Sequence, residues 1–255
     1  MTLPTLSIAM IVQNEERQLP ALLARLDWAD EVVIVDGGSR DASVQVARDA
    51  GARVFTRPFD TFANQRNFAL SLCRSEWVLS LDADERPTAR MADEIRQRIR
   101  TSRHAAFRVP IKSTILGRRM RFGGTQDDLP VRLFRREAAQ WEGSVHEVLR
   151  VSGRIGRLDS WLEHHTLPDL DQFKSKVRRY TTLAAQARVA AGQRPWPGQG
   201  TYGAAREFFR RLVWKQGILD GPVGWSFCAL SGWSEWVLAG THRRLWKEHR
   251  RRIAR

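Results

Sequence analysis

The sequence predicts an α/β fold with a mostly parallel central sheet, and three features lead to this prediction. Short apolar runs occur at residues 7–12, 32–35 and 77–81, as is typical of strands that are buried on both faces. Segments with apolar residues at helical spacing lie between these runs. The chain has 255 residues, enough for one large domain with or without an appendage. Strands that alternate with helices in this order form βαβ units, and therefore parallel pairs.

The first half of the chain repeats a strand and a helix. Residues 7–12 are the first strand, and the helix after it has its apolar positions at Leu19, Leu22, Leu23 and Leu26. Residues 32–35 are the second strand, and the next helix ends near Gly51, because glycine accepts the left-handed backbone that closes many helices. Residues 53–55 are a third, short strand. A helix capped by Asp60 or Thr61 then precedes the strand at residues 77–81.

The second half of the chain is less regular. Met91, Ile95 and Ile99 indicate another amphipathic helix, and alternating residues at 107–111 predict a half-exposed strand. A further strand is predicted at residues 131–134. A long basic helix is predicted at residues 173–191, where Gly192 ends it.

Charge is distributed unevenly along the chain. The formal net charge is +14, and the last 55 residues contribute +7 of it. This excess favours an anionic partner for the C-terminal part: a phosphorylated substrate, a nucleic acid or an acidic lipid surface. The two cysteines, Cys73 and Cys228, are far apart and form no metal-binding pattern or disulfide framework, so a reducing cytosol is the simplest compartment. The N-terminus has no signal-peptide pattern, and we expect no secretion.

The C-terminal part is also rich in tryptophan. Six of the ten tryptophans lie from Trp196 onward, beside many arginines, which fits a segment that lies in the headgroup region of a bilayer. The alternative is a helical pair that packs on the first domain with its aromatic residues in the core. Residues 222–240 have about the length of a membrane span, but Glu235, three glycines and a proline make them a poor one.

Polar side chains follow three of the predicted strands at the point where each strand ends. Asn14 and Asp36 follow the first two, and Asp82 and Asp84 follow the strand at residues 77–81. Because ligands bind at the carboxyl ends of parallel strands, we expect these residues to line one cleft. Two carboxylates separated by one small residue suit a divalent cation bound to a phosphorylated ligand. The alternative is a solvated loop in which an aspartate caps a helix.

Four segments in this order resemble the family 2 glycosyltransferases: residues 7–15 ending in Asn14-Glu15, Asp36-Gly37-Gly38-Ser39, Gln65-Arg66-Asn67 and Asp82-Ala83-Asp84-Glu85. With Arg132-Leu133-Phe134, Val145-His146-Glu147 and the tail from Leu219, the chain is similar to bacterial lipopolysaccharide-core glycosyltransferases of the WaaE/KdtX type. The similarity covers nearly the whole chain. It implies a GT-A fold, a nucleotide-sugar donor, a Mg²⁺ or Mn²⁺ ion and inversion at the anomeric carbon.

The resemblance also implies roles for individual residues. Asp36 contacts the nucleoside, through its base, and Asn14 and Arg66 lie near the nucleotide. Asp82 approaches the ribose, and Asp84 coordinates the ion that bridges the diphosphate. Such an ion acts as a Lewis acid on the charge that grows on the leaving oxygen. His146 can reach the ion or the diphosphate, or act as a hydrogen-bonded structural histidine.

Inversion in a single displacement requires a base that takes the proton of the acceptor hydroxyl. Asp128 is the candidate, because its place before Arg132 matches the acidic position of the family. Relatives tend to have an aromatic-aromatic-Pro-Asp run at this place, whereas this chain has two adjacent acids, so Asp127 is an alternative. Glu147 is another.

We therefore predict a catalytic domain at residues 1–165 and a helical C-terminal region at residues 166–255. The predicted function is an inverting, metal-dependent transfer of a sugar, with UDP-glucose as the donor implied by the resemblance, to a lipid-linked lipopolysaccharide inner-core acceptor. The enzyme would lie on the anionic inner face of the cytoplasmic membrane. One alternative is a polyprenyl-phosphate sugar transferase. A basic nucleic-acid-binding protein is another, but no nucleic-acid module is present in the sequence.

Overall fold

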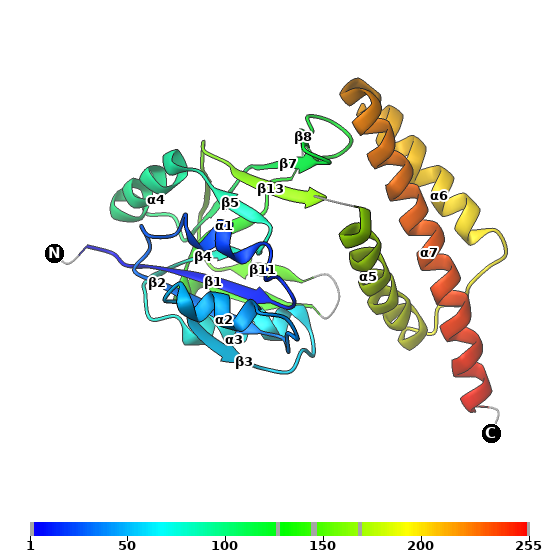
Figure 1. Cartoon of the computed structure of the whole chain (residues 1–255), viewed down its shortest axis with the longest axis horizontal. Coiled ribbons are helices and arrows are strands. Elements are labelled where there is room, and N and C mark those ends of the chain that lie inside the picture. The colour runs from blue at the N-terminus through cyan, green and yellow to red at the C-terminus, as the bar shows by residue number, and fades with distance from the viewer. Residues whose placement is uncertain (1–2, 126–127, 144–146, 168–169, 254–255) are drawn as a thin grey trace. The chain divides into compact units, whose positions relative to one another are not determined.

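The computed structural model describes residues 3–125, 128–143, 147–167 and 170–253 (Figure 1). The chain divides into two compact units. The first comprises Met1–Ile111 and Asp128–His165, and the second comprises Lys112–Asp127 and Thr166–Arg255. The division into domains at residues 1–165 and 166–255 stays a prediction. In the structure the segment at residues 112–127 clusters with the helical unit.

The first unit is built on a seven-stranded sheet with the order β12-β6-β9-β4-β1-β2-β3. Its strands are β1 (Leu6–Val12), β2 (Glu31–Asp36), β3 (Arg53–Thr56), β4 (Trp77–Leu81), β6 (Ala106–Arg108), β9 (Val131–Arg135) and β12 (Ile155–Arg157). β4, β1, β2 and β3 are parallel neighbours, and β9 runs antiparallel to both β4 and β6. The carboxyl ends of β1, β2 and β4 therefore meet at one edge of the sheet.

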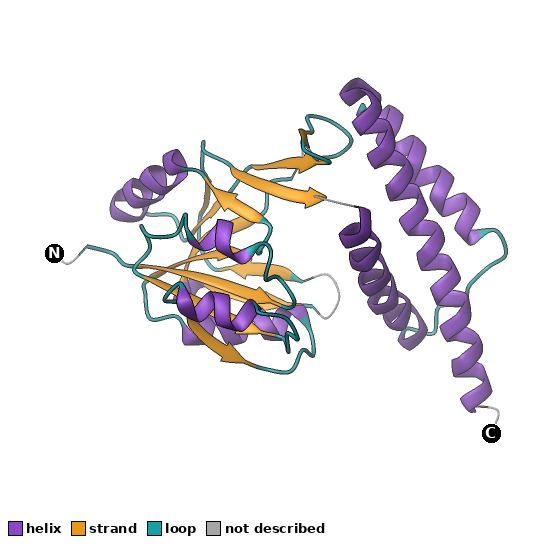
Figure 2. Cartoon of the chain, in the orientation of Figure 1, coloured by secondary structure: helices purple, strands orange, loops and turns teal. Residues whose placement is uncertain are grey.

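Helices cover both faces of this sheet, as the orange strands between purple helices show (Figure 2). The unit contains α1 (Leu19–Leu23), α2 (Ser43–Asp49), α3 (Phe62–Leu72) and α4 (Ala89–Thr101). Side chains of α1, α2 and α4 enter one core cluster, which includes Leu22, Ala47 and Ile95. Those of α3 enter a second cluster with Trp141. The predicted α/β class with a mostly parallel sheet and a helical C-terminal region is confirmed.

Local signals explain where several elements begin and end. Thr61 caps α3, and its Oγ1 accepts a hydrogen bond from the backbone N of Asn64 at 3.2 Å. Gly51 follows α2 with φ +81°, in the left-handed region that glycine enters at little cost. The strand predicted at residues 107–111 is interrupted: β6 ends at Arg108, and β7 (Ile111–Ile115) begins after Pro110. Proline has no N–H to donate to a strand ladder.

Smaller strands complete the first unit. β10 (Ala139–Glu142) and β11 (Val148–Val151) pair antiparallel, with the short helix η1 (Arg136–Ala138) before them. β5 (Glu85–Pro87) and β13 (Leu162–Leu167) also pair antiparallel, in a register that places His164 opposite Glu85. This pairing brings a distant segment of the chain to the residues that follow β4.

The second unit is a layer of helices: α5 (Leu170–Ala190), α6 (Gln199–Phe209), η2 (Arg210–Trp214), η3 (Gly217–Asp220) and α7 (Gly221–Ile253). The central helix, α7, packs against both α5 and α6 (Figure 1). The contact with α6 is close, since a Cβ at Gly232 would lie 2.8 Å from the carbonyl oxygen of Ala204. None of the helices in the described ranges combines the length and the apolar character that crossing a membrane requires.

A short hairpin belongs to the helical unit. It consists of β7 and β8 (Arg118–Arg119), which pair antiparallel. The loop after β8 is held by Asp220, whose carboxylate accepts hydrogen bonds from the backbone N–H groups of Arg121 and Phe122 at 2.8–3.1 Å. Arg211 donates to the carbonyl oxygen of Gly123 at 2.8 Å. These bonds fix residues 121–123 to η2 and η3.

Candidate active site

The candidate site begins where β4 ends. β4 is fully buried, and the turn that follows carries Asp82, Asp84 and Glu85. The turn closes on itself: Glu85 N donates to Asp82 O at 3.0 Å, and Asp82 N donates to the Glu85 carboxylate at 3.0 Å. These two hydrogen bonds within the turn hold the acids in place in the absence of a ligand.

Asp82 lies between two arginines. Its Oδ1 accepts a hydrogen bond from Arg66 Nη2 at 2.8 Å, and its Oδ2 accepts one from Arg132 Nη2 at 2.8 Å. Burial opposes the charge of Asp82, but the charges and hydrogen bonds of Arg66 and Arg132 outweigh it and hold the pKa of this carboxyl far below its ordinary range. Asp82 is therefore a fixed anion that already has two cationic partners.

Arg132 connects Asp82 to a second acid. The same Nη2 atom donates to Glu85, whose side chain is 0% exposed. Burial, assisted by the nearby charge of Asp82, raises the pKa of Glu85 above its ordinary value although Arg132 acts in the opposite direction. A buried guanidinium thus holds two carboxylates together. Among the described residues, Arg66 also forms an ion pair with Asp82.

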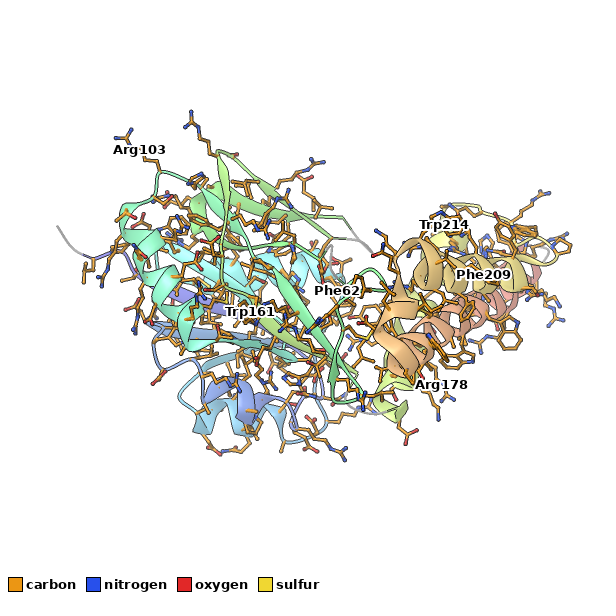
Figure 3. The ribbon with its side chains drawn as sticks, turned by 90° about the horizontal axis from the view of Figure 1, so that it is seen from above. Phe62, Arg103, Trp161, Arg178, Phe209 and Trp214 are labelled. Carbon is orange, nitrogen blue, oxygen red and sulfur yellow. The ribbon has the colours of Figure 1, made fainter. Side chains whose placement is uncertain are left out.

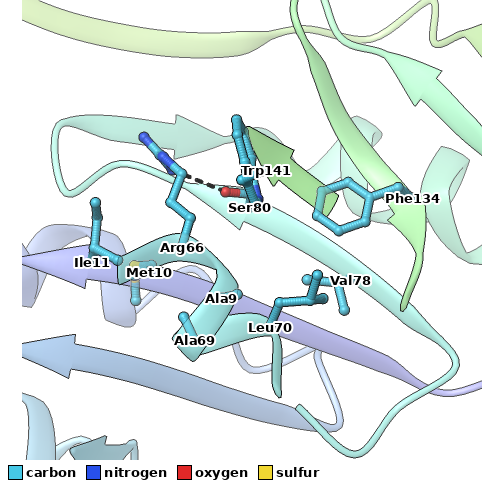
Figure 4. A pocket seen from close by; sticks show the side chains of 10 residues that line it. All are labelled: Ala9, Met10, Ile11, Arg66, Ala69, Leu70, Val78, Ser80, Phe134 and Trp141. Atoms are coloured by element: carbon cyan, nitrogen blue, oxygen red, sulfur yellow. Dashed lines mark hydrogen bonds between the residues drawn. The ribbon is translucent and has the colours of Figure 1, made fainter. Parts of the chain in front are cut away.

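Arg66, on α3, makes four contacts through one guanidinium. Beside its bond to Asp82, Nη1 donates to Ser80 Oγ at 3.1 Å and Nε donates to Glu147 Oε1 at 3.3 Å. The group also lies over the ring of Trp141, 4.9 Å from its centre (Figure 4). A cavity of about 10 Å³ lies among the apolar side chains next to Arg66, room for about one water. Arg66 therefore joins the carboxylates of Asp82 and Glu147.

Asp84 points to a different partner. Its Oδ1 lies 3.3 Å from Nε2 of His164, and its backbone oxygen accepts from His165 N at 2.9 Å. Burial opposes protonation of His164, but the hydrogen bond and charge of Asp84, with the charges of Glu85 and Asp82, raise the pKa of the imidazole above its ordinary value. The β5–β13 pairing creates this contact.

This raised pKa predicts how His164 affects stability. The pKa of His164 is higher in the folded state than in the unfolded state, where it is about 6.5, so protonation of His164 stabilises the fold. This stabilisation is fully present below about pH 6.5 and is lost as the pH rises through the folded-state pKa. We expect the difference in Tm between wild type and His164→Gln to be largest below about pH 6.5 and to shrink as the pH rises above it. Thermal unfolding by circular dichroism measures it, with the exposed His249→Gln as the control. A difference that stays constant with pH would contradict this assignment.

Asn14 and Asp36 lie at the ends of β1 and β2, and both organise the loop at residues 37–41. Asn14 has a positive φ of +58°, its N donates to Ser39 Oγ, and its Oδ1 accepts from Arg40 N, both at 2.8 Å. The buried carboxylate of Asp36 accepts from the backbone N–H groups of Gly38 and Ser39 at 2.9–3.2 Å. These contacts join the two strand ends.

The structure describes two of the three residues predicted as the catalytic base, Asp128 and Glu147. Asp128 has an exposed side chain, and its backbone oxygen accepts a hydrogen bond from Ile111 N at 3.1 Å. Asp127 and His146 lie outside the described residues. Glu147 is half-buried and is held by Arg66 beside Asp82. The structure thus brings Arg66, Asp82 and Glu147 together, with Asp84 two residues along the chain.

Sequence reasoning assigned no role to Arg132, to Glu85 or to the contact of His164 with Asp84. One signal for Arg132 was present: a charged residue between apolar residues of a predicted buried strand needs a buried partner. Its two partners are 50 and 47 residues away, so the sequence could not identify them. The contact of His164 depends on a strand pairing that no local pattern predicts.

A divalent cation is the group that the resemblance implies here. Among the residues that the structure describes, no three His, Cys, Asp or Glu side chains converge as in a metal site made by protein alone. Mg²⁺ usually takes one or two carboxylates and completes its shell with substrate phosphates and water. Asp84 is a buried carboxylate at the end of β4 beside His164, and one such carboxylate fits this kind of partial site.

These observations define an α/β protein with a cluster of charged side chains at the carboxyl ends of its parallel strands. The chain belongs to glycosyl transferase family 2, the family that residues 7–146 match. Membership of this family, with this sheet, agrees with the GT-A fold that the sequence resemblance implied.

The relatives include proteins matched over most of their length. The lipopolysaccharide core biosynthesis glycosyltransferase LpsC of Rhizobium meliloti (strain 1021) is 31% identical over 90% of this chain and 86% of its own length. An uncharacterized glycosyltransferase of Rickettsia typhi is 25% identical over 74% of this chain and 70% of its own. The structure of S. aureus TarS 1–349 in complex with UDP has 14% identity and a TM-score of 0.48, and the match covers 97% of this chain and 91% of the chain in that structure. A likeness at that level assigns no ligand to the present chain.

Proposed function

We propose that this glycosyltransferase moves a sugar from a nucleotide-diphosphate donor to a lipid-linked saccharide of the lipopolysaccharide core, with inversion at the anomeric carbon. The observation that carries the proposal is the charged cluster at the end of β4, where Asp82, Asp84 and Glu147 are held by arginines and a histidine. The similarity to LpsC over 90% of the chain supports the acceptor class.

The nucleotide part of the donor would lie along the ends of β1, β2 and β4. Asn14 and Asp36 shape the loop that would face the nucleoside, and Asp82 would accept hydrogen bonds from the ribose. Arg66 and Arg132 keep Asp82 ionised and pointed in one direction, and a preorganised anion loses little freedom when it binds a hydroxyl. Arg66 would act on the nucleotide through Asp82, because each of its three nitrogens already donates a hydrogen bond inside the protein.

Asp84 would hold the Mg²⁺ or Mn²⁺ ion. When bound, such an ion stabilises the charge on the leaving diphosphate as a Lewis acid. The contribution of this chain is to keep the Asp84 carboxylate buried and oriented by His164. A partner that orients a carboxylate ligand commonly affects metal affinity. His146 is a further candidate ligand.

The base that takes the acceptor proton is proposed to be Asp128, with Asp127 and Glu147 as alternatives. An observation favours Glu147 as the second candidate: its carboxylate shares Arg66 with Asp82, so it lies within the cluster. The pH dependence of kcat for Asp128→Asn and Glu147→Gln separates the two, because loss of the base removes the acidic limb of the profile.

The donor is proposed to be UDP-glucose. We expect it to raise Tm in the presence of Mg²⁺ or Mn²⁺ more than other nucleotide sugars do, because a ligand that binds only the folded state stabilises it by mass action. At a concentration of about 100 times Kd the stabilisation is about 2.7 kcal/mol. The measurement is a thermal-shift panel of UDP- and ADP-linked sugars with and without metal. No shift with any donor would argue against a nucleotide-sugar enzyme.

The acceptor is tested by transfer. Product should form on delipidated core oligosaccharide and not on polyprenyl phosphate, whereas the reverse preference would identify a polyprenyl-phosphate sugar transferase. The site of action is proposed to be the inner face of the cytoplasmic membrane, on an anionic lipid surface. A basic nucleic-acid-binding protein would instead show DNA binding that weakens steeply with salt and no sugar transfer.

A further inference from the structure

The helical unit carries an unusual number of exposed apolar side chains. Four of them form what we call the apolar tip, in η2 and η3: Val213, Trp214, Ile218 and Leu219, each more than half exposed. Trp214 is 76% exposed, and it is labelled with Phe209 on the surface of the helices in Figure 3. Contiguous exposed apolar groups rimmed by polar residues mark surfaces that bind a partner or a membrane.

A second feature begins at the apolar tip and runs along α7. Trp225 donates its indole N–H to the carbonyl oxygen of Ile218 at 3.3 Å, which connects the tip to the first turns of the helix. Helical spacing places seven exposed residues of α7 along one side, which is interrupted at the buried Gly232, where α6 packs. We call these residues the α7 stripe: Trp225, Ala229, Trp236, Gly240, Arg243, Lys247 and Arg250. At 1.5 Å per residue the stripe is about 38 Å long.

The stripe changes character along its length. Its first half presents tryptophans and small residues, and its second half presents only cations. Within the described part of α7 the two acids, Glu235 and Glu248, lie on other faces of the helix. Glu207 of α6 is buried and paired with Arg210 and Arg211. The cations of the stripe therefore lack a carboxylate partner on their own face.

We infer that the apolar tip and the α7 stripe form a docking surface for an anionic lipid bilayer. This inference specifies the membrane contact of the proposed function and rests on it. Tryptophan prefers the headgroup region, where its ring is buried and its N–H stays polar, and exposed aliphatic residues beside it enter the acyl boundary. Arginine and lysine at the other end of the stripe pair with lipid phosphates.

Two other occupants fit the surface less well. A nucleic acid would use the cations and stack on tryptophan, but it gives no partner to Val213, Ile218 and Leu219. A second copy of the chain would present the same stripe, which has three cations and no carboxylate, so the cations would gain no anionic partner. Charge complementarity therefore selects the anionic bilayer.

The test is co-sedimentation of the full chain with vesicles of equimolar phosphatidylglycerol and phosphatidylcholine, and with vesicles of phosphatidylcholine alone. We expect binding to the anionic vesicles and at least about tenfold weaker binding to the neutral ones. Trp214→Ser with Trp225→Ser should weaken binding by about tenfold or more. The control is Trp196→Ser, which removes an exposed tryptophan in the loop before α6.

A second variant tests the basic half of the stripe. Replacing Arg243, Lys247 and Arg250 with glutamine should weaken anionic-vesicle binding by about 100-fold. The matched control removes the same charge from the exposed Arg48, Arg100 and Arg103 of the first unit. If the two triple variants lost affinity for the anionic vesicles equally, the proposed docking surface would be contradicted, because net charge alone would then explain binding. Thermal unfolding checks that each variant is folded.

Transfer to a delipidated, water-soluble acceptor separates this inference from the proposed function. The stripe and tip variants should keep that activity while they lose vesicle binding. A wild-type chain that transfers sugar but binds no vesicle, or that forms a dimer abolished by Trp214→Ser with Trp225→Ser, would overturn the inference alone. A chain that binds anionic vesicles but transfers no sugar would overturn the proposed function alone.

Discussion

Asp84→Asn is expected to lower kcat/KM by about 1,000-fold while the protein stays folded. The carboxylate of Asp84 lies at the end of β4 beside His164, two residues after Asp82, and it is the group proposed to bind the metal ion. Lewis-acid stabilisation of a leaving group is worth several kcal/mol, and each 1.36 kcal/mol is tenfold in rate. Initial rates of sugar transfer at saturating Mg²⁺ or Mn²⁺ measure the effect.

Two comparisons isolate the metal role of Asp84. Asp93→Asn removes an exposed acid on α4 and should leave the rate unchanged. A chelator should abolish the wild-type activity, but it should change the residual activity of Asp84→Asn very little. If Asp84→Asn kept a rate within tenfold of wild type, with the same dependence on metal, the ion would have to be held by other residues.

Arg132→Met is expected to reduce the free energy of unfolding by about 3–5 kcal/mol, because it leaves buried charges without their partner. Glu85 is 0% exposed and loses its cation, and Asp82 keeps only Arg66. Most of this loss of stability is the cost of leaving Asp82 and Glu85 buried without Arg132, and not the net strength of the ion pairs. Urea unfolding at neutral pH measures the change.

The partner substitution and a surface pair serve as controls. Glu85→Gln in the Arg132→Met background should recover part of the loss, because it removes one of the unpaired charges, and the two changes should be less than additive. Arg150→Met breaks an exposed pair with Glu142 and should cost about 0–1 kcal/mol. If Arg132→Met were as stable as Arg150→Met, the prediction would be wrong, and water or a rearranged side chain would have to replace Arg132 as the partner of Asp82 and Glu85.

The candidate site was predictable in part. Asp82 and Asp84 were identified from the end of an apolar run, and the structure places them at the end of β4. The sequence prediction treated Arg66 as a residue near the nucleotide, whereas the structure shows that its guanidinium is occupied by Ser80, Asp82 and Glu147. A motif identifies the residue type that a site needs, but it does not say which groups the side chain already contacts.

What the sequence by itself determined is the local part of the structure. Short apolar runs, the cap at Thr61 and the glycine after α2 act over a few residues, and so β1 to β4 and α1 to α4 follow from such local signals. The tertiary structure alone decided which charges meet. Arg132 reaches Glu85 because β9 runs antiparallel beside β4, and His164 reaches Asp84 because β13 pairs with β5. Contacts between residues some 50 to 80 positions apart depend on strand order, which local patterns do not contain.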